Sequence, residues 1–236
     1  MFIPSFSYIS WVAFPLDCNA QSDMLVITMN QHIQHPVIDD RMARLRQCDC
    51  PTSEFRTYVR EIAQMMVPSV TENLFTMSVE VKTPLEVTTG RKLEREIVLV
   101  PILRAGLGML DGFLNLLPTA SVAHIGMERD EQTLQPRSYY FKAPTVLNHA
   151  DVIVIDPMLA TGGSAAAAIS ELKNNGAKHI RFACLVAAPE GLQTMNNAHP
   201  DVSVYYPALD NRLNKQGYIL PGLGDAGDRI FGTVNP

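Results

Sequence analysis

The chain has 236 residues, of which 47% are hydrophobic and 18% charged, and its formal net charge is -5 at pH 7. These values are typical of a folded globular protein, so they exclude the disordered and fibrous classes, and the negative charge argues against binding to nucleic acid. The length suits one domain with a single core, and no linker-like run divides it.

The four cysteines, Cys18, Cys48, Cys50 and Cys184, are too few and too irregularly spaced to form a disulfide framework. This usage predicts a reducing, cytoplasmic location. Cys48 and Cys50 have no second Cys or His pair at zinc spacing, so we expect no metal site built by protein ligands alone.

The first 30 residues are expected to be an extension outside the fold. They contain no Lys or Arg, whereas a secretory signal needs a basic start and a transit peptide is rich in Arg. Their apolar run is broken by Pro, Ser and Asp and is too short to span a bilayer. We therefore expect one domain over residues 31–236 and no contact with a membrane.

Two helices and an exposed strand are predicted next. Apolar residues near helical spacing predict a helix over 37–46. A second helix is expected to begin at a Ser53 cap and to end before Pro68. The alternating segment 77–84 predicts an exposed strand.

Beyond residue 96, short apolar runs alternate with helix-like segments. The expected strands are 97–103, 121–127, 151–155, 180–186 and 202–206, and the expected helices are 106–117, 164–176 and 189–199. The alternation predicts an α/β domain with one mainly parallel sheet of about five strands flanked by helices. Pro189 suits the first turn of a helix, Gly176 suits a helix C-terminus, and Pro101 is expected to end the first strand.

The strongest chemical signal is the stretch VIVIDPMLATGGSAAAAI over 152–169. A buried strand runs into Asp156, then into a Gly- and hydroxyl-rich turn, then into an Ala-rich helix. Residues 156–164, which we call the phosphate loop, thus end at a helix N-terminus with free N–H groups, a common anion site. Asp156 suits hydrogen bonds from sugar hydroxyls, so the loop predicts a site for a phosphorylated sugar.

Three alternative interpretations compete with a phosphorylated-sugar site. A nucleoside-triphosphate P-loop requires a Lys that is absent here, and a hydrolase elbow requires a glycine where Ala166 stands. A plain strand-to-helix turn stays open, because Gly, Ser and Thr are common in such turns.

Residues 104–106, which we call the arginine turn, repeat this arrangement after strand 97–103. Arg104 suits bidentate binding of a second phosphate, and Gly106 lets the backbone approach it. The alternative is a surface arginine beside a helix start.

A third glycine-rich stretch spans residues 218–227, and we call it the base loop. Gly222, Gly224 and Gly227 match the dinucleotide fingerprint G-x-G-x-x-G. Only nine residues follow Gly227, so we expect no helix, strand and ribose-binding acid after it. A base-reading loop and an ordered turn are the remaining interpretations.

Five stretches in this order, VPILRAGLGM, GMERDEQTL, DPMLATGGS, VAAPEGL and GYILPGLGDAGDRIFGT, together resemble uracil phosphoribosyltransferase. The similarity runs from about His35 to Thr233. It implies a phosphoribosyltransferase-type fold with a base-binding hood. It also implies conversion of uracil and 5-phosphoribosyl-1-diphosphate (PRPP) to UMP and diphosphate with Mg2+, a homodimer or homotetramer, and GTP as a candidate effector.

The resemblance also implies the roles of individual residues. The implied catalytic residues are Asp156, Arg104 and Asp225. The implied PRPP-binding residues are Arg104, Ala105, Gly106, Arg129, Asp156, Pro157, Met158, Leu159, Ala160, Thr161, Gly162, Gly163, Ser164 and Asp225. The implied uracil-binding residues are Tyr218, Ile219, Gly224, Asp225 and Ala226. Residues 128–138 are expected to form a mobile loop that covers PRPP.

Some positions depart from the family pattern. Glu128 and Gln132 stand in the mobile loop, where the added charge of Glu128 either weakens PRPP binding or points to solvent. Asp39 and Asp40 replace basic residues, which affects the expected oligomer contacts or effector binding. Two other functions stay open: a non-catalytic sensor of PRPP or nucleotides, and an enzyme of this fold that uses a purine or orotate.

Overall fold

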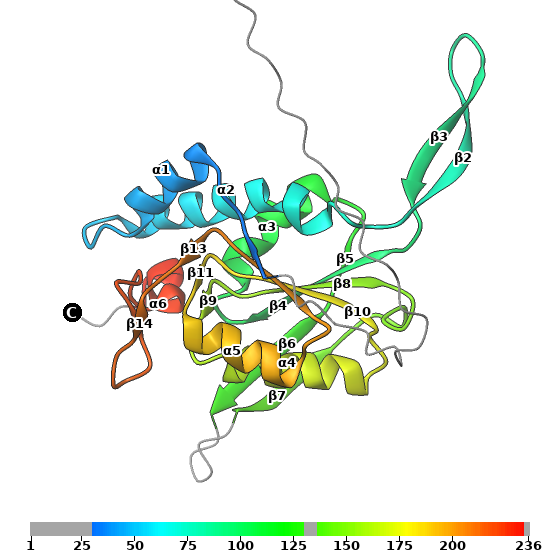
Figure 1. Ribbon diagram of the computed structural model, residues 1–236. Coiled ribbons are helices and arrows are strands. Elements are labelled where there is room, and N and C mark those ends of the chain that lie inside the picture. Colours follow the sequence, from blue (N-terminus) through cyan, green and yellow to red (C-terminus); the bar gives the residue numbers. More distant parts are fainter. Residues whose placement is uncertain (1–29, 130–135, 234–236) are drawn as a thin grey trace, which may run out of the picture.

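One large sheet lies between two layers of helices in the computed structural model, which describes residues 30–129 and 136–233 (Figure 1). The order of its strands is β1-β12-β10-β8-β4-β6-β7, with β5 beside β4. The pairings are parallel except that between β6 and β7. These strands are β1 (Gln31–His32), β4 (Ile97–Leu103), β5 (Ser121–Val122), β6 (His124–Arg129), β7 (Pro136–Lys142), β8 (Asp151–Ile155), β10 (His179–Ala183) and β12 (Ser203–Tyr206).

Three smaller sheets and six helices complete the described residues. The remaining strands are β2 (Thr76–Lys82) with β3 (Val87–Leu93), β14 (Arg212–Leu213) with β15 (Ile219–Leu220), and the group β9 (Met158–Leu159), β11 (Val186–Ala187) and β13 (Ala208–Leu209). The helices are α1 (Pro36–Leu45), α2 (Thr52–Thr71), α3 (Leu107–Leu116), α4 (Gly163–Asn174), α5 (Pro189–Ala198) and α6 (Ala226–Phe231). None of these helices is long and apolar enough to cross a membrane.

Alternate residues of the central strands supply two cores, one on each face of the sheet. Ile97 and Leu99 pack with buried side chains of α1, α2, α3 and α6. Val98 and Val100 pack with those of α4 and α5. Because both faces are covered, the central strands are apolar throughout, as the sequence suggested. Figure 1 shows α1 and α2 on one side of the sheet and α4 and α5 on the other.

The α/β prediction is confirmed, but the sheet is larger than the expected five strands. Strand β8 has the predicted bounds, Pro189 opens α5, and Gly176 follows α4 with a φ of 94°. The short edge strand β1 and the antiparallel β7 were not predicted. Likewise, the expected strand at 77–84 is β2, but its partner β3 was missed because it is polar and exposed.

Pro101 does not end its strand, contrary to expectation, because β4 continues to Leu103. On one side, β4 pairs with β5 at Val98 and Leu99 and with β6 only from Ile102. The N–H of Ala123, between β5 and β6, donates to the carbonyl of Leu99, so residue 101 faces this same side. Pro101 therefore lies where the ladder is already interrupted, and its missing N–H costs little.

The predicted limits of the second helix are also wrong. Helix α2 begins after Pro51 without a side-chain cap, so Ser53 lies inside its first turn. At the other end it passes through Pro68 to Thr71. Val67 and Val70 are buried in the core that α2 shares with α3, and this packing holds the last turn although Pro68 cannot donate a hydrogen bond.

Candidate active site

The phosphate loop starts at the carboxyl end of β8. The backbone N–H of Asp156 donates to the Ala183 carbonyl oxygen at 3.1 Å, and the side chain is half-buried. Burial raises the pKa of Asp156 to about 7, against the opposing effect of a hydrogen bond from the Met158 backbone. Hydrogen bonds from bound hydroxyl groups would stabilise its ionised form.

Helix α5 supports the loop from behind. A Cβ added to Gly191 of α5 would lie 2.6 Å from the carbonyl oxygens of Leu159 and Ala160, and one added to Gly162 would lie 2.8 Å from Cβ of Thr194. Gly162 also has a φ of 80°, a conformation that glycine adopts without strain. The two glycines therefore let the loop and the helix pack in direct backbone contact.

The end of the phosphate loop can bind an anion. No side chain caps the N-terminus of α4, and the side chains of Thr161 and Ser164 are exposed. The first N–H groups of the helix and the two hydroxyls are thus available to phosphate oxygens.

The arginine turn lies directly beside this loop. The carboxyl ends of the two strands are neighbours, because Pro101, two residues before the end of β4, is in register with Ile155, the last residue of β8. A Cβ on Gly106 would come within 2.5 Å of the Ile155 carbonyl oxygen. The Arg104 side chain is 59% exposed, and its Nη2 lies 3.4 Å from Asp228 Oδ1. Arg104 is therefore open enough to meet a ligand.

The base loop reaches both of these segments. A Cβ on Gly217, which precedes the loop, would lie 3.7 Å from Cγ2 of Thr161, and one on Gly227 would lie 3.9 Å from Nη2 of Arg104. Asp225 caps α6 by accepting the N–H of Asp228 at 2.9 Å. Three stretches far apart in the sequence thus meet at one edge of the sheet.

A short helix, α6, lies where the dinucleotide fingerprint would require a helix, a strand and a ribose-binding acid in succession. It begins at Ala226 and has six residues, and no strand follows it among the residues described up to 233. Gly222 and Gly224 adopt φ values of 65° and 80° in the turn before it. The glycines serve a tight turn into a helix, which is not the βαβ arrangement that binds a dinucleotide.

The base loop offers mainly backbone groups to a ligand. Ile219 as a whole is only 4% exposed, so its peptide groups, like its side chain, are largely covered in this structure. The N–H and C=O of Tyr218 are used within the hairpin by Asn214, whereas the Tyr218 side chain is half exposed. Gly224 and Asp225 are exposed, and Ala226 is buried.

Both ends of the expected mobile loop at 128–138 belong to strands in the structure. Glu128 ends in strand β6, and Arg137 and Ser138 belong to β7. The Glu128 carboxylate pairs with the Arg137 guanidinium at 2.8 Å, so its negative charge is balanced across the hairpin. Residues 130–135, which include Gln132, and the side chain of Arg129 lie outside the described residues.

Three functional candidates were missed by sequence reasoning. Asp228 contacts Arg104, and a second acid three positions after Asp225 was the available signal. Arg46 and Asp210 form a bidentate ion pair, with both Nη–Oδ distances 2.8 Å, and bind Gly222 of the base loop. They lie 164 residues apart in the chain, so nothing in the sequence connects them.

No group of three or more His, Cys, Asp or Glu side chains able to hold a metal ion occurs in the parts of the chain that the structure describes. Asp156 is a carboxylate of the phosphate loop, and Asp225 is a carboxylate of the base loop. This donor set suits a cation that keeps most of its ligands as water and substrate oxygens.

Comparison with known proteins identifies close relatives. The model of the uracil phosphoribosyltransferase family matches residues 32–233. The uracil phosphoribosyltransferase of Ligilactobacillus salivarius is 53% identical over 204 residues, which cover 86% of this chain and 98% of that protein. That of Dictyoglomus thermophilum is 52% identical over 202 residues, covering 85% and 98%. A solved structure of a protein from Aquifex aeolicus superposes with a TM-score of 0.83 at 35% identity, covering 88% of this chain and 100% of the other.

Proposed function

The chain belongs to the uracil phosphoribosyltransferase family, and from this premise we propose the site at which it converts uracil and PRPP to UMP and diphosphate in pyrimidine salvage. The observation that carries the proposal is the meeting of the phosphate loop, the arginine turn and the base loop at one sheet edge. Gly217 approaches Thr161, Gly227 approaches Arg104, and Gly106 approaches Ile155.

Each segment takes one part of the substrates. The N–H groups and hydroxyls of residues 160–164 bind the 5-phosphate, and Asp156 accepts hydrogen bonds from the ribose hydroxyls. Arg104 and Arg129 bind the diphosphate. Residues Tyr218, Ile219, Gly224, Asp225 and Ala226 surround uracil, with Asp225 between the base and PRPP.

The reaction needs no protein nucleophile, because diphosphate leaves readily once its charge is neutralised. The bond from ribose C1 to diphosphate breaks and the bond from C1 to uracil N1 forms. Asp156 holds the ribose while C1 carries positive charge, and Arg104 holds the growing negative charge of diphosphate. Closure of the site around the reactants keeps out water, which would hydrolyse PRPP.

Mg2+ would supply further neutralisation of the diphosphate charge. Asp156 and Asp225 are the carboxylates placed to hold its water ligands. The product itself tests the proposed function: chromatography should show UMP after incubation with uracil, PRPP and Mg2+, and no UMP when EDTA is added. UMP formation unaffected by EDTA would contradict the role of the metal, and absence of UMP in both samples would contradict the function.

We expect activity to rise with pH around neutrality because of Asp156. Burial raises the pKa of this carboxyl from 3.8 to about 7, and only the ionised form accepts two hydrogen bonds from the ribose. Therefore kcat/KM for PRPP should increase as the pH rises through about 7. The same shift makes Asp156 destabilising: its cost to folding appears above the unfolded pKa of about 4 and grows until the pH passes 7.

The Asp156→Asn variant is the control for this profile. The ionisation of PRPP affects both enzymes equally. The ratio of wild-type to variant kcat/KM therefore reports the ionisation of Asp156 alone. The ratio should rise with pH between about 6 and 8 and then level off. A ratio independent of pH would show that Asp156 is ionised throughout that range.

We also propose that the chain is a homo-oligomer, because the β2–β3 hairpin needs a partner. Figure 1 shows this hairpin projecting from the body of the protein, and a two-stranded hairpin is barely stable alone in water. It exposes apolar side chains, among them Phe75, Leu85 and Val87, of which Leu85 is 95% exposed. A second copy of the chain would cover them.

Gel filtration tests the oligomer. The wild-type chain should elute as a homodimer or homotetramer, and the double variant Leu85→Lys, Val87→Lys should shift toward the monomer, whereas Thr88→Lys on the same hairpin should not. A monomeric wild-type chain would contradict the proposal. Repeating the run and the assay with GTP tests this nucleotide as an effector, which would change the elution or the rate.

A cytoplasmic location is part of the proposal. The proposal is supported by the cysteines of the described residues: Cys48, Cys50 and Cys184 are free thiols, and free thiols persist in a reducing compartment. Fractionation of the host cells should recover the enzyme with cytoplasmic markers.

A further inference from the structure

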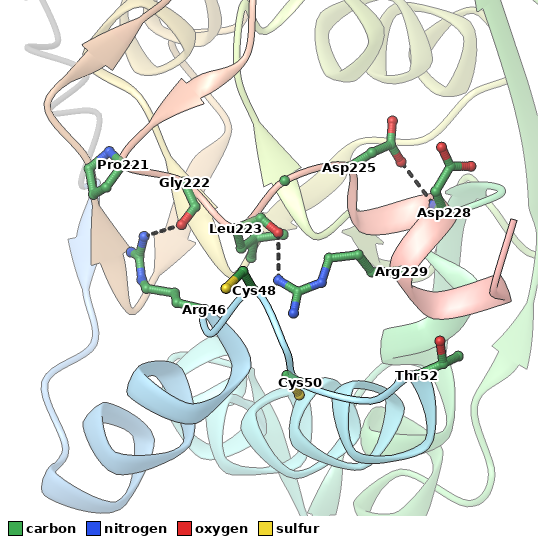
Figure 2. A pocket seen from close by; sticks show the side chains of 11 residues that line it. Arg46, Cys48, Cys50, Thr52, Pro221, Gly222, Leu223, Asp225, Asp228 and Arg229 are labelled. Carbon is green, nitrogen blue, oxygen red and sulfur yellow. Dashed lines mark hydrogen bonds between the residues drawn. The ribbon is translucent and has the colours of Figure 1, made fainter. Parts of the chain in front are cut away.

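Both peptide groups of Gly222 in the base loop are held by charged side chains. Its N–H donates to Oδ2 of Asp210 at 2.8 Å, and its carbonyl oxygen accepts from Nη1 of Arg46 at 2.7 Å. Figure 2 shows the guanidinium of Arg46 directed at the Gly222 carbonyl oxygen from below the loop. Since Arg46 and Asp210 also bind each other, the three residues close a ring of hydrogen bonds.

This ring is shielded from water. The Asp210 side chain is 7% exposed and that of Arg46 is 23% exposed. An ion pair of the neighbouring arginine in α1, Arg44 with Asp40, has both side chains about half exposed. Surface pairs contribute little, whereas removal of one member of a buried pair leaves the other charge without compensation. The ring should therefore fix Gly222 far more firmly than a surface pair would.

The ring also joins the base loop to the phosphate loop. Asp210 follows β13, and its backbone N–H donates to the Ala187 carbonyl oxygen of β11. Strand β11 pairs with β9, which is residues 158–159 of the phosphate loop. Arg46 enters from the end of α1. Displacement of either side chain would thus remove one of the links between the base loop and the sheet that carries the phosphate loop.

Gly222 lies against Ile219, a residue that is expected to contact uracil. Gly222 has a φ of 65° and packs so tightly on Ile219 that a Cβ there would collide with the Ile219 carbonyl oxygen. The backbones of Gly222 and Ile219 therefore lie close together, so the position of one constrains the position of the other. At the next residue, Arg229 Nη1 donates to the carbonyl oxygen of Leu223 at 2.7 Å, so a second arginine also holds the backbone of this turn.

We infer that Arg46 and Asp210 are positioning residues that set the base loop for uracil without touching either substrate. This inference rests on the proposed function, because it takes residues 218–227 as the uracil site. Substrate selectivity depends on peptide groups placed within a few tenths of an ångström. Loosening the ring should then weaken uracil binding and the choice of base, and leave PRPP binding intact.

The experiment compares matched pairs of variants. Arg46→Gln is paired with Arg44→Gln, which removes an exposed charge from the same helix end. Asp210→Asn is paired with Asp201→Asn, whose carboxylate forms an exposed pair with Lys173. Arg46→Lys keeps the positive charge but loses the planar guanidinium, which binds both oxygens of the Asp210 carboxylate. For each, KM and kcat are measured with uracil, cytosine and PRPP, together with the melting temperature.

Arg46→Gln and Asp210→Asn should raise KM for uracil about tenfold or more, lower the ratio of uracil to cytosine kcat/KM, and change KM for PRPP less than threefold. Arg46→Lys should lie between them and the wild type, and both controls should match the wild type. If uracil and PRPP constants deteriorate together, or if neither changes, the inference is wrong. If Arg46→Gln does not fold, Asp210→Asn decides. An inactive wild type would instead contradict the proposed function.

Discussion

Arg104→Ala should lower kcat/KM for PRPP by roughly 30- to 1000-fold, which corresponds to about 2–4 kcal/mol of transition-state stabilisation. The guanidinium is mostly exposed, lies 3.4 Å from Asp228 and approaches the Phe231 ring at 5.9 Å. The guanidinium can therefore give up its weak contact with Asp228 and bind the negatively charged diphosphate instead. Because its side chain contributes little to the core, the fold should survive.

Arg56→Ala is the matched control for this variant. Arg56 is also an exposed arginine, and its Nε makes only a long bond of 3.4 Å to the Thr52 carbonyl oxygen. Steady-state kinetics with varied PRPP should separate the two variants, with melting curves to confirm that both are folded. A change of less than threefold in folded Arg104→Ala would show that Arg104 is not a substrate ligand.

Discrimination between uracil and cytosine is the largest effect we expect, on the order of 10⁴ in kcat/KM. Uracil presents an N3–H donor between two carbonyl acceptors, whereas cytosine presents an acceptor at N3 beside an amino donor. The base loop offers peptide groups of Ile219 and Gly224 that are fixed by the turn and cannot exchange donor for acceptor. Cytosine would set like groups against each other, and a buried polar group without a partner is costly.

The measurement is kcat/KM for uracil and cytosine at saturating PRPP and Mg2+. A backbone carbonyl facing N3–H and backbone N–H groups facing the uracil carbonyls would produce the expected ratio. Pro221 lacks an N–H, so it is not one of these donors. Use of cytosine within tenfold of uracil, or a crystal with uracil bound away from residues 218–227, would contradict this role of the base loop.

Local chemistry explains which elements the sequence predicts well. Strand β8 has the predicted bounds because four consecutive apolar residues, 152–155, are buried on both faces of the sheet and are followed by Asp156. Gly176 and Pro189 mark helix ends because each has a conformational preference that needs no tertiary contact. Strand β8 and the start of α5 lie next to the phosphate loop, so this part of the candidate site is the easiest to predict.

Tertiary context decides the elements that the sequence does not predict. Pro101 is tolerated in β4 because the ladder is interrupted beside it, and Pro68 is tolerated in α2 because Val67 and Val70 are buried. The polar strand β3 shows no apolar periodicity, since it is exposed and is held by its hairpin partner β2. Strand β7 carries three aromatic residues in a row, 139–141, without alternation, and it is held by its antiparallel partner β6.

Long-range pairs are the part of the site that no local pattern reveals. Arg46 and Asp210 look like ordinary charged residues in the sequence, and only the fold brings them to Gly222. Glu128 looked like an added charge near an anionic substrate, but the fold places Arg137 opposite it across the hairpin.

Release of diphosphate from PRPP, measured with uracil, hypoxanthine, orotate and no base, tests the central claim most directly. The structure and family membership predict release with uracil in the presence of Mg2+, and only background release in the other three reactions. Release with hypoxanthine or orotate at the rate seen with uracil would contradict the assignment of the base. No release above background with any base would contradict catalysis altogether and would favour a protein that only senses PRPP or nucleotides.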